Sequence, residues 1–159
     1  MTEATNTEDT GNKPELIIHR LFIKDLSFEA PHSPKIFNAE WKPEVDVHLD
    51  STSQHLESDL YDVTLRITNT AKLKDETVFI AEVKQAGIFL VHGFEKEQQE
   101  ELLGSFCPNV LFPYAREVIS NMIHRGGFPP LYLAPVNFDA IYQQRKQYSS
   151  AANLSLIHI

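Results

Sequence analysis

The first two thirds of the chain alternate between apolar and polar residues in a way that predicts β-strands. The clearest case is LYDVTLRITNTAKL (60–73), whose period of two is typical of a strand with one buried face. EVDVHLD (44–50) alternates in the same way. A longer run, TVFIAEVKQAGIFLVHGF (77–94), predicts a strand whose pattern resets near Gly87, at a bend or bulge. The apolar, β-branched segment ELIIHRLFIKDLSFEAP (15–31) predicts a fourth strand, with imperfect alternation.

The segments between these strands predict how the strands are connected. Polar residues at 51–58 and 74–77 predict short turns, and short turns favour an antiparallel sheet with one wet face. The connection over 29–43 is much longer and contains Pro34 and Pro43. We therefore expect it to cross over the sheet instead of forming a simple hairpin.

The last third of the chain predicts helices. EKEQQEELLGSF (95–106) has a helix-forming composition, and CPN (107–109) is expected to interrupt it. A second helix over 110–125 has a broad apolar stripe, and the glycines at 126–127 provide its C-terminal stop. A last helix is expected from about Asn137, a suitable cap. The predicted fold class is α+β, a four-stranded antiparallel sheet with a crossover connection and helices packed on one face.

The chain of 159 residues is expected to form one domain with two unlike ends. Residues 1–14 are polar and acidic, and we expect a disordered N-terminal arm. The folded domain is expected over 15–148. Residues 149–159 read SSAANLSLIHI, and we expect a flexible tail that is either a natural variant or a non-native scar of cloning or frameshift. We expect no signal peptide and no membrane span, and therefore a cytoplasmic protein.

Charge and cysteine content narrow the class of partner. The formal net charge is −8 and the pI about 5.3, which disfavours nucleic acid and favours a basic partner. The one cysteine, Cys107, can form no intrachain disulfide, and a reducing cytosol fits this composition.

Candidate catalytic chemistry is sparse. The seven histidines have no metal-ligand spacing, and no nucleophile elbow or phosphate-binding loop is present in the sequence. We expect Cys107 to be a buried structural thiol, not a nucleophile. Asp25 and Glu29 could act as paired carboxylates, but a solvated charged face is the simpler interpretation. We therefore expect no enzyme, no metal site and no cofactor.

Large aromatic residues lie in and beside the proline-rich connection. Phe28, Phe37 and Trp41 could simply pack in the core. They could instead remain partly exposed and form a groove for apolar side chains of a peptide. The residues alone leave both interpretations open.

Five segments of the chain resemble a known family. They are KDLSFEAP (24–31), EWKPEV (40–45), EVKQAGIF (82–89), CPNVLFPYARE (107–117) and LAPVNFDA (133–140). Each is similar to a signature segment of SecB, the bacterial protein-export chaperone family, and they occur in the family's order and at its spacing. The resemblance covers roughly residues 15–145.

The resemblance implies an assembly and a function. It implies a four-stranded antiparallel sheet with helices on one side, and a dimer of dimers with the helices between outer sheets. It implies a holdase that binds unfolded preproteins without ATP and delivers them to the SecA motor at the inner membrane.

The resemblance also implies which residues bind SecA. Asp25, Glu29, Ile80 and Glu82 match the family's SecA-binding positions. Ile80 and Glu82 share strand parity with Lys84, on the predicted wet face, although Ile80 could be an ordinary half-exposed residue. The SecA segment that binds there is a positively charged, zinc-bearing C-terminal tail, so any zinc belongs to the partner.

The client groove is expected between residues 29–43 and 127–138. Its predicted residues are Phe28, Phe37, Trp41, Leu131, Leu133 and Phe138. Two features depart from the simplest export assignment. The tail lacks the acidic residues of many family members, and a divergent branch of SecB-like proteins serves toxin–antitoxin systems. Carboxylates at Asp25, Glu29 and Glu82 favour export.

Overall fold

The computed structural model describes the backbone of residues 13–157 and the side chains of residues 13–148. Most of the predicted N-terminal arm and the side chains of the predicted tail lie outside the described residues. No helix in the described part is long and apolar enough to cross a membrane.

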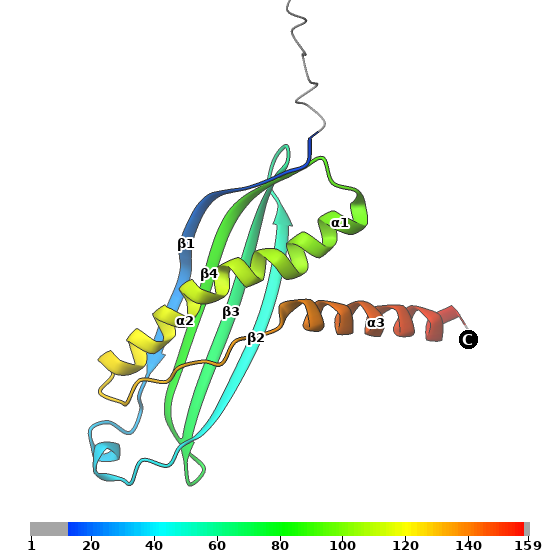
Figure 1. The fold of residues 1–159 in the computed structure, drawn as a ribbon. Helices are drawn as coiled ribbons and strands as arrows, with labels where there is room; N and C mark the ends of the chain where they lie inside the picture. The colour runs from blue at the N-terminus through cyan, green and yellow to red at the C-terminus, as the bar shows by residue number, and fades with distance from the viewer. Residues whose placement is uncertain (1–12, 158–159) are drawn as a thin grey trace, which may run out of the picture.

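A four-stranded sheet forms the body of the molecule (Figure 1). Its strands are β1 (Glu15–Glu29), β2 (Glu44–His55), β3 (Leu60–Leu73) and β4 (Glu76–His92), in the spatial order β1-β4-β3-β2. Every neighbouring pair is antiparallel. Because β1 and β2 are the two edge strands, the segment that joins them must cross the sheet, which confirms the predicted crossover.

Three α-helices follow on one face of the sheet (Figure 1). A short α1 (Lys96–Glu101) continues through a π-helical turn, η3 (Leu102–Phe106), into α2 (Cys107–Arg125). The chain then returns along the sheet to α3 (Phe138–Ile157), which extends beyond the β2 edge. The α+β fold with helices on one face is confirmed. We call the face under α2 the inner face and the opposite one the outer face.

The predicted break at 107–109 is wrong, because the chain stays helical from Lys96 to Arg125. The amide of Cys107 donates to the carbonyl of Leu102, five residues earlier. This wider π turn gives space for the ring of Pro108, which lies in the first turn of α2, where its missing N–H costs little.

The predicted pattern reset in β4 is also wrong. One parity, from Phe79 to Val91, stays buried on the inner face throughout. The prediction failed because Gln85 is a polar residue on that face; its Nε2 donates to the carbonyl of Phe22 at 3.2 Å. Gly87 marks a close contact, since a Cβ there would lie 2.7 Å from the ring of Phe89.

Two irregularities of the sheet lie in β1, and a third lies near the start of β4, where Val78 is an extra residue between Thr77 and Phe79 in the pairing with β3. The register with β4 shifts between Ile18 and Arg20 and again between Ile23 and Asp25, so His19 and Lys24 are extra residues at two bulges. These bulges explain why the alternation of this segment is imperfect. The turn predicted at 51–58 is shorter than expected, because pairing with β3 continues β2 to His55 despite its polar composition.

The core lies between the inner face and α2. It contains Val63, Leu65, Ile67, Val83 and Phe89 from the sheet, and Leu111, Ala115, Ile119 and Ile123 from the helix. Helix α2 packs chiefly on β3 and β4. The inner sides of the edge strands are therefore only partly covered: Phe28 on β1 packs against the core, while Ile23 and Leu26 are each 45% exposed.

Candidate partner-binding and client-binding surfaces

The sheet register brings the four residues predicted to bind SecA onto one surface. Glu29 pairs directly with Ile80, and Ser27, two residues before Glu29, pairs with Glu82. Asp25 pairs with Lys84, one step further along. Directly opposed residues of adjacent strands project from the same face of a sheet. The residues 81 and 83 between them are buried under α2, so this set lies on the outer face.

The electrostatic character of this surface is acidic and open. We call the four residues Asp25, Glu29, Ile80 and Glu82 the partner face. Asp25 and Glu29 are exposed, and Ile80 and Glu82 are partly exposed. One oxygen of Glu82 accepts a hydrogen bond from Thr68 on β3 at 2.9 Å, and this bond orients the carboxylate. Among residues 13–148, none of the three carboxylates forms an ion pair.

A cluster of five aromatic rings lies where β1, the crossover and the end of α2 meet. We call Phe28, Phe37, Trp41, Phe79 and Phe128 the aromatic cluster. Phe128 is its centre, with ring centroids of Phe37, Phe79 and Trp41 at 5.2, 5.2 and 5.5 Å and that of Phe28 at 6.5 Å. Phe28 also stacks on Phe79 at 5.9 Å.

The end of α2 places Phe128 at that centre. Gly127 has a φ of +92°, and its amide donates to the carbonyl of His124 at 3.0 Å. The amide of Phe128 donates to the carbonyl of Ile123 at 3.2 Å, which completes a Schellman motif. The chain therefore turns back toward the sheet directly after the helix.

Two glycines leave the space that two rings occupy. A Cβ at Gly126 would lie 2.3 Å from the ring of Phe28, and one at Gly127 would lie 3.0 Å from the ring of Phe37. From the sequence, these glycines were predicted only to stop the helix. Phe128 was not among the predicted groove residues, although its position directly after a glycine C-cap could have indicated it.

Exposure divides the aromatic cluster into two parts. We call the buried rings of Phe79 and Phe128 the base, and the more exposed rings of Phe28, Phe37 and Trp41 the wall. Phe79 and Phe128 are 1% and 4% exposed, and Phe28 and Trp41 are partly buried. Phe37 is 48% exposed. Phe37 is therefore the ring most accessible to an incoming apolar side chain.

The other predicted groove residues lie in or directly after the segment between α2 and α3, residues 126–137, which we call the return segment. Leu131 is partly buried and Leu133 is buried, and both pack against the core. Phe138 begins α3 and contacts the ring of Phe112 at 5.6 Å, apart from the aromatic cluster. It borders two cavities of about 510 and 880 Å³, on either side of the start of α3.

Cys107 lies at the start of α2, in the core. Burial raises the pKa of its thiol from 9.0 to about 12. The thiolate that nucleophilic chemistry needs is therefore scarce at neutral pH. Within the described residues, no group of three or more His, Cys, Asp or Glu side chains could hold a metal ion.

Comparison with known proteins gives concordant matches. Residues 9–149 match the family model described as preprotein translocase subunit SecB. Protein-export protein SecB of Nitrosococcus oceani is 49% identical over 154 residues, which is 94% of each chain. Protein-export protein SecB of Methylococcus capsulatus is 48% identical over 140 residues, covering 88% of this chain and 90% of that one.

A solved structure has a similar fold. It is the Mycobacterium tuberculosis Rv1957 SecB-like chaperone in complex with a ChAD peptide from the Rv1956 HigA1 antitoxin. The TM-score is 0.63 at 17% sequence identity, over 76% of this chain and 90% of that chain. At this identity the likeness shows a shared fold alone.

Proposed function

This chain belongs to the SecB family of protein-export chaperones, and from that premise we propose that it holds unfolded preproteins without ATP and delivers them to SecA. The observation that carries this proposal is the separation of two surfaces on one small domain. The partner face lies on the outer side of the sheet, and the aromatic cluster lies at its end, around the crossover. A client and a motor protein could therefore bind at the same time.

We assign the partner face to the positively charged, zinc-bearing tail of SecA. Three carboxylates that form no ion pair within residues 13–148 offer charge complementarity. The partly exposed Ile80, opposite Glu29 at the end of this set, offers apolar contact area. Complementary charge mainly speeds encounter and fixes orientation, while the apolar contact supplies affinity. The zinc in this complex belongs to SecA.

We assign client binding to the exposed side of the aromatic cluster and to the return segment with Leu131, Leu133 and Phe138. Burial of apolar area contributes ~25 cal/mol per Å², so a single side chain on Phe37 and Trp41 binds weakly. A long unfolded chain that touches several such sites binds far more tightly. Folded proteins hide those side chains, and this explains selectivity without a nucleotide switch.

We further propose that the working form is a dimer of dimers. The exposed residues Ile23 and Leu26 on the inner side of β1, and the unpaired edge of that strand, both favour contact with a second copy. We place this assembly in the cytoplasm, where an export chaperone meets preproteins before they cross the membrane.

Two binding assays on three variants test the assignment of the two surfaces. Glu82→Lys reverses the charge on the partner face, and Phe37→Ala removes the exposed ring of the aromatic cluster. We expect Glu82→Lys to weaken binding of the isolated SecA tail and to leave capture of an unfolded preprotein unchanged. We expect the opposite result for Phe37→Ala.

Tyr148→Ala is the matched control, because Tyr148 is 80% exposed on α3, away from both surfaces. It should change neither assay. Equal loss of both activities in Glu82→Lys and Phe37→Ala would mean that the two surfaces are not separate. Unchanged SecA-tail binding by Glu82→Lys would favour a chaperone outside export, such as one serving a toxin–antitoxin system.

A further inference from the structure

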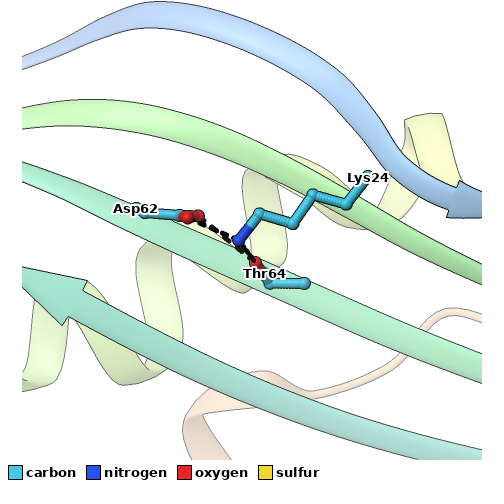
Figure 2. Close-up of polar contacts among 3 residues, drawn as sticks. All are labelled: Lys24, Asp62 and Thr64. Atoms are coloured by element: carbon cyan, nitrogen blue, oxygen red, sulfur yellow. Dashed lines mark hydrogen bonds and ion pairs between the residues drawn. The ribbon is translucent and has the colours of Figure 1, made fainter.

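Lys24 forms a bridge across the outer face of the sheet. Its side chain leaves β1, passes over β4 and reaches β3 (Figure 2). Its ammonium group forms an ion pair with the carboxylate of Asp62 and donates to Oγ1 of Thr64 at 2.9 Å. Thr64 also donates to Asp62 at 3.2 Å, so the three groups form one connected network.

Lys24 is also the extra residue of a bulge. Ile23 pairs with Gln85 on the inner face, and the next paired residue of β1 is Asp25, which pairs with Lys84 on the outer face. Strict alternation from Ile23 would instead turn Asp25 and Glu29 to the inner face. The bulge at Lys24 therefore decides on which side of the sheet these two carboxylates lie.

The network ties this bulge to the centre of the sheet. As an edge strand, β1 pairs on one side only, and a bulge interrupts that pairing. Asp62 and Thr64 belong to β3, which is paired on both sides. The side chain of Asp62 is 14% exposed, and Thr64 as a whole residue is 8% exposed. A charge-assisted bond to such a fixed acceptor restrains the lysine backbone.

We propose that Lys24 is a positioning residue that holds Asp25 and Glu29 in place on the partner face. This inference rests on the proposed binding of a cationic SecA tail by that face. Lys24 does not contact the tail; it acts through the bulge that orients its two neighbours.

The affinity of the Lys24→Met variant for the SecA tail should distinguish a positioning role from a simple effect of charge. Lys24→Met keeps most of the aliphatic stem and removes one positive charge. Coulomb attraction alone predicts that an acidic protein with one positive charge fewer binds a cationic tail more tightly. Loss of positioning predicts the opposite: about five- to tenfold weaker binding, the scale of one net hydrogen bond.

Lys84→Met is the matched control, since Lys84 is a partly exposed cation on the same face and forms no ion pair among the described residues. It should leave tail binding unchanged or slightly tighter. Lys24→Arg can still bridge to β3 and should retain wild-type affinity. Thr64→Val removes one acceptor without any change of charge, and it should also weaken binding of the tail. This variant replaces Lys24→Met in the test if the methionine variant does not fold.

The experiment measures binding of the isolated SecA tail and, independently, backbone amide exchange in residues 25–29. We expect Lys24→Met to weaken binding and to speed exchange in this segment, and Lys84→Met to do neither. Asp25→Asn tests the proposed partner face itself and should weaken binding. If Asp25→Asn has no effect, the partner assignment fails, and the exchange data alone decide whether Lys24 fixes the segment. Two results would overturn the inference: unchanged exchange in residues 25–29, or binding by Lys24→Met that is as tight as wild type or tighter while Asp25→Asn binds more weakly.

Discussion

At the scale of single residues, Phe128 is the buried residue around which the candidate client site is built. Four rings contact it, and it is 4% exposed. Phe37 contacts the same ring but keeps about half of its surface in solvent. Residues of one cluster can therefore serve different purposes: Phe128 supports the fold, and Phe37 offers contact area.

Substitution of these two rings should separate stability from binding. We expect Phe128→Ala to lower the free energy of unfolding by about 3–5 kcal/mol, because it leaves a cavity among four rings. Phe37→Ala should cost about 1 kcal/mol, because its ring is half exposed, while it weakens client capture. Chemical denaturation of both variants measures the difference; equal costs would contradict the division into base and wall.

Cys107 provides a second prediction at this scale. Its thiol pKa is about 12 in the folded protein against an ordinary 9.0, so the folded state disfavours the thiolate. Alkylation by iodoacetamide at pH 8 should therefore be slow in the native protein and fast in denaturant. Rapid alkylation without denaturant would show that the thiol is accessible.

The same pKa predicts a loss of stability at high pH. A raised folded pKa means that the contribution is fully present below pH 9 and is lost as the pH rises toward 12. Cys107→Ala lacks this group, so its stability should fall less over that range than the stability of the wild type. Parallel curves for the two proteins would contradict the prediction.

At the scale of elements, the sequence predicted the types of structure better than their irregularities. Clean alternation in 60–73 identified β3, and the crossover followed from one long connection. The bulges in β1 were not predictable, because they depend on pairing with β4. The π turn was missed for a similar reason: a local pattern indicates that Pro108 breaks a helix, and only the wider preceding turn shows that it does not.

The candidate site shows the same limit. Asp25 and Glu82 could be assigned from the family resemblance, but the reason that they share a face is the bulge at Lys24. Phe28, Phe37 and Trp41 were predicted to act together, and the structure brings them together around Phe128. Phe128 itself was missed, because its position depends on the turn at Gly127.

The π turn also positions α3, and this gives a prediction for the element. A Cβ at Gly104 would lie 2.6 Å from the ring of Tyr142 on α3. We expect Gly104→Ala to displace that helix at a cost of about 1–3 kcal/mol and to speed proteolysis within α3. The double variant Gly104→Ala/Tyr142→Ala should cost less than the sum of the single changes. Strict additivity would show that the contact does not hold α3.

At the scale of the whole molecule, an open stretch of the inner side of β1 is the main apolar surface that the described residues leave exposed. Ile23 on this side is 45% exposed, and Ile17 on the outer side of the same strand is 46% exposed. The two residues form a matched pair with equal exposure on opposite faces.

This pair tests the proposed assembly. We expect Ile23→Glu to shift the protein to smaller species in sedimentation, because a buried carboxylate at a self-interface is costly. Ile17→Glu should leave the assembly intact. If both variants sediment like the wild type, the inner side of β1 is not part of the interface.

The most direct test of the export-holdase assignment is native mass spectrometry of the chain with a long unfolded preprotein and with the same preprotein after folding. We expect a tetramer that captures the unfolded chain without ATP and does not bind the folded one. A monomer or dimer that binds neither form, or an assembly that binds both equally, would contradict the assignment of this chain as an export holdase.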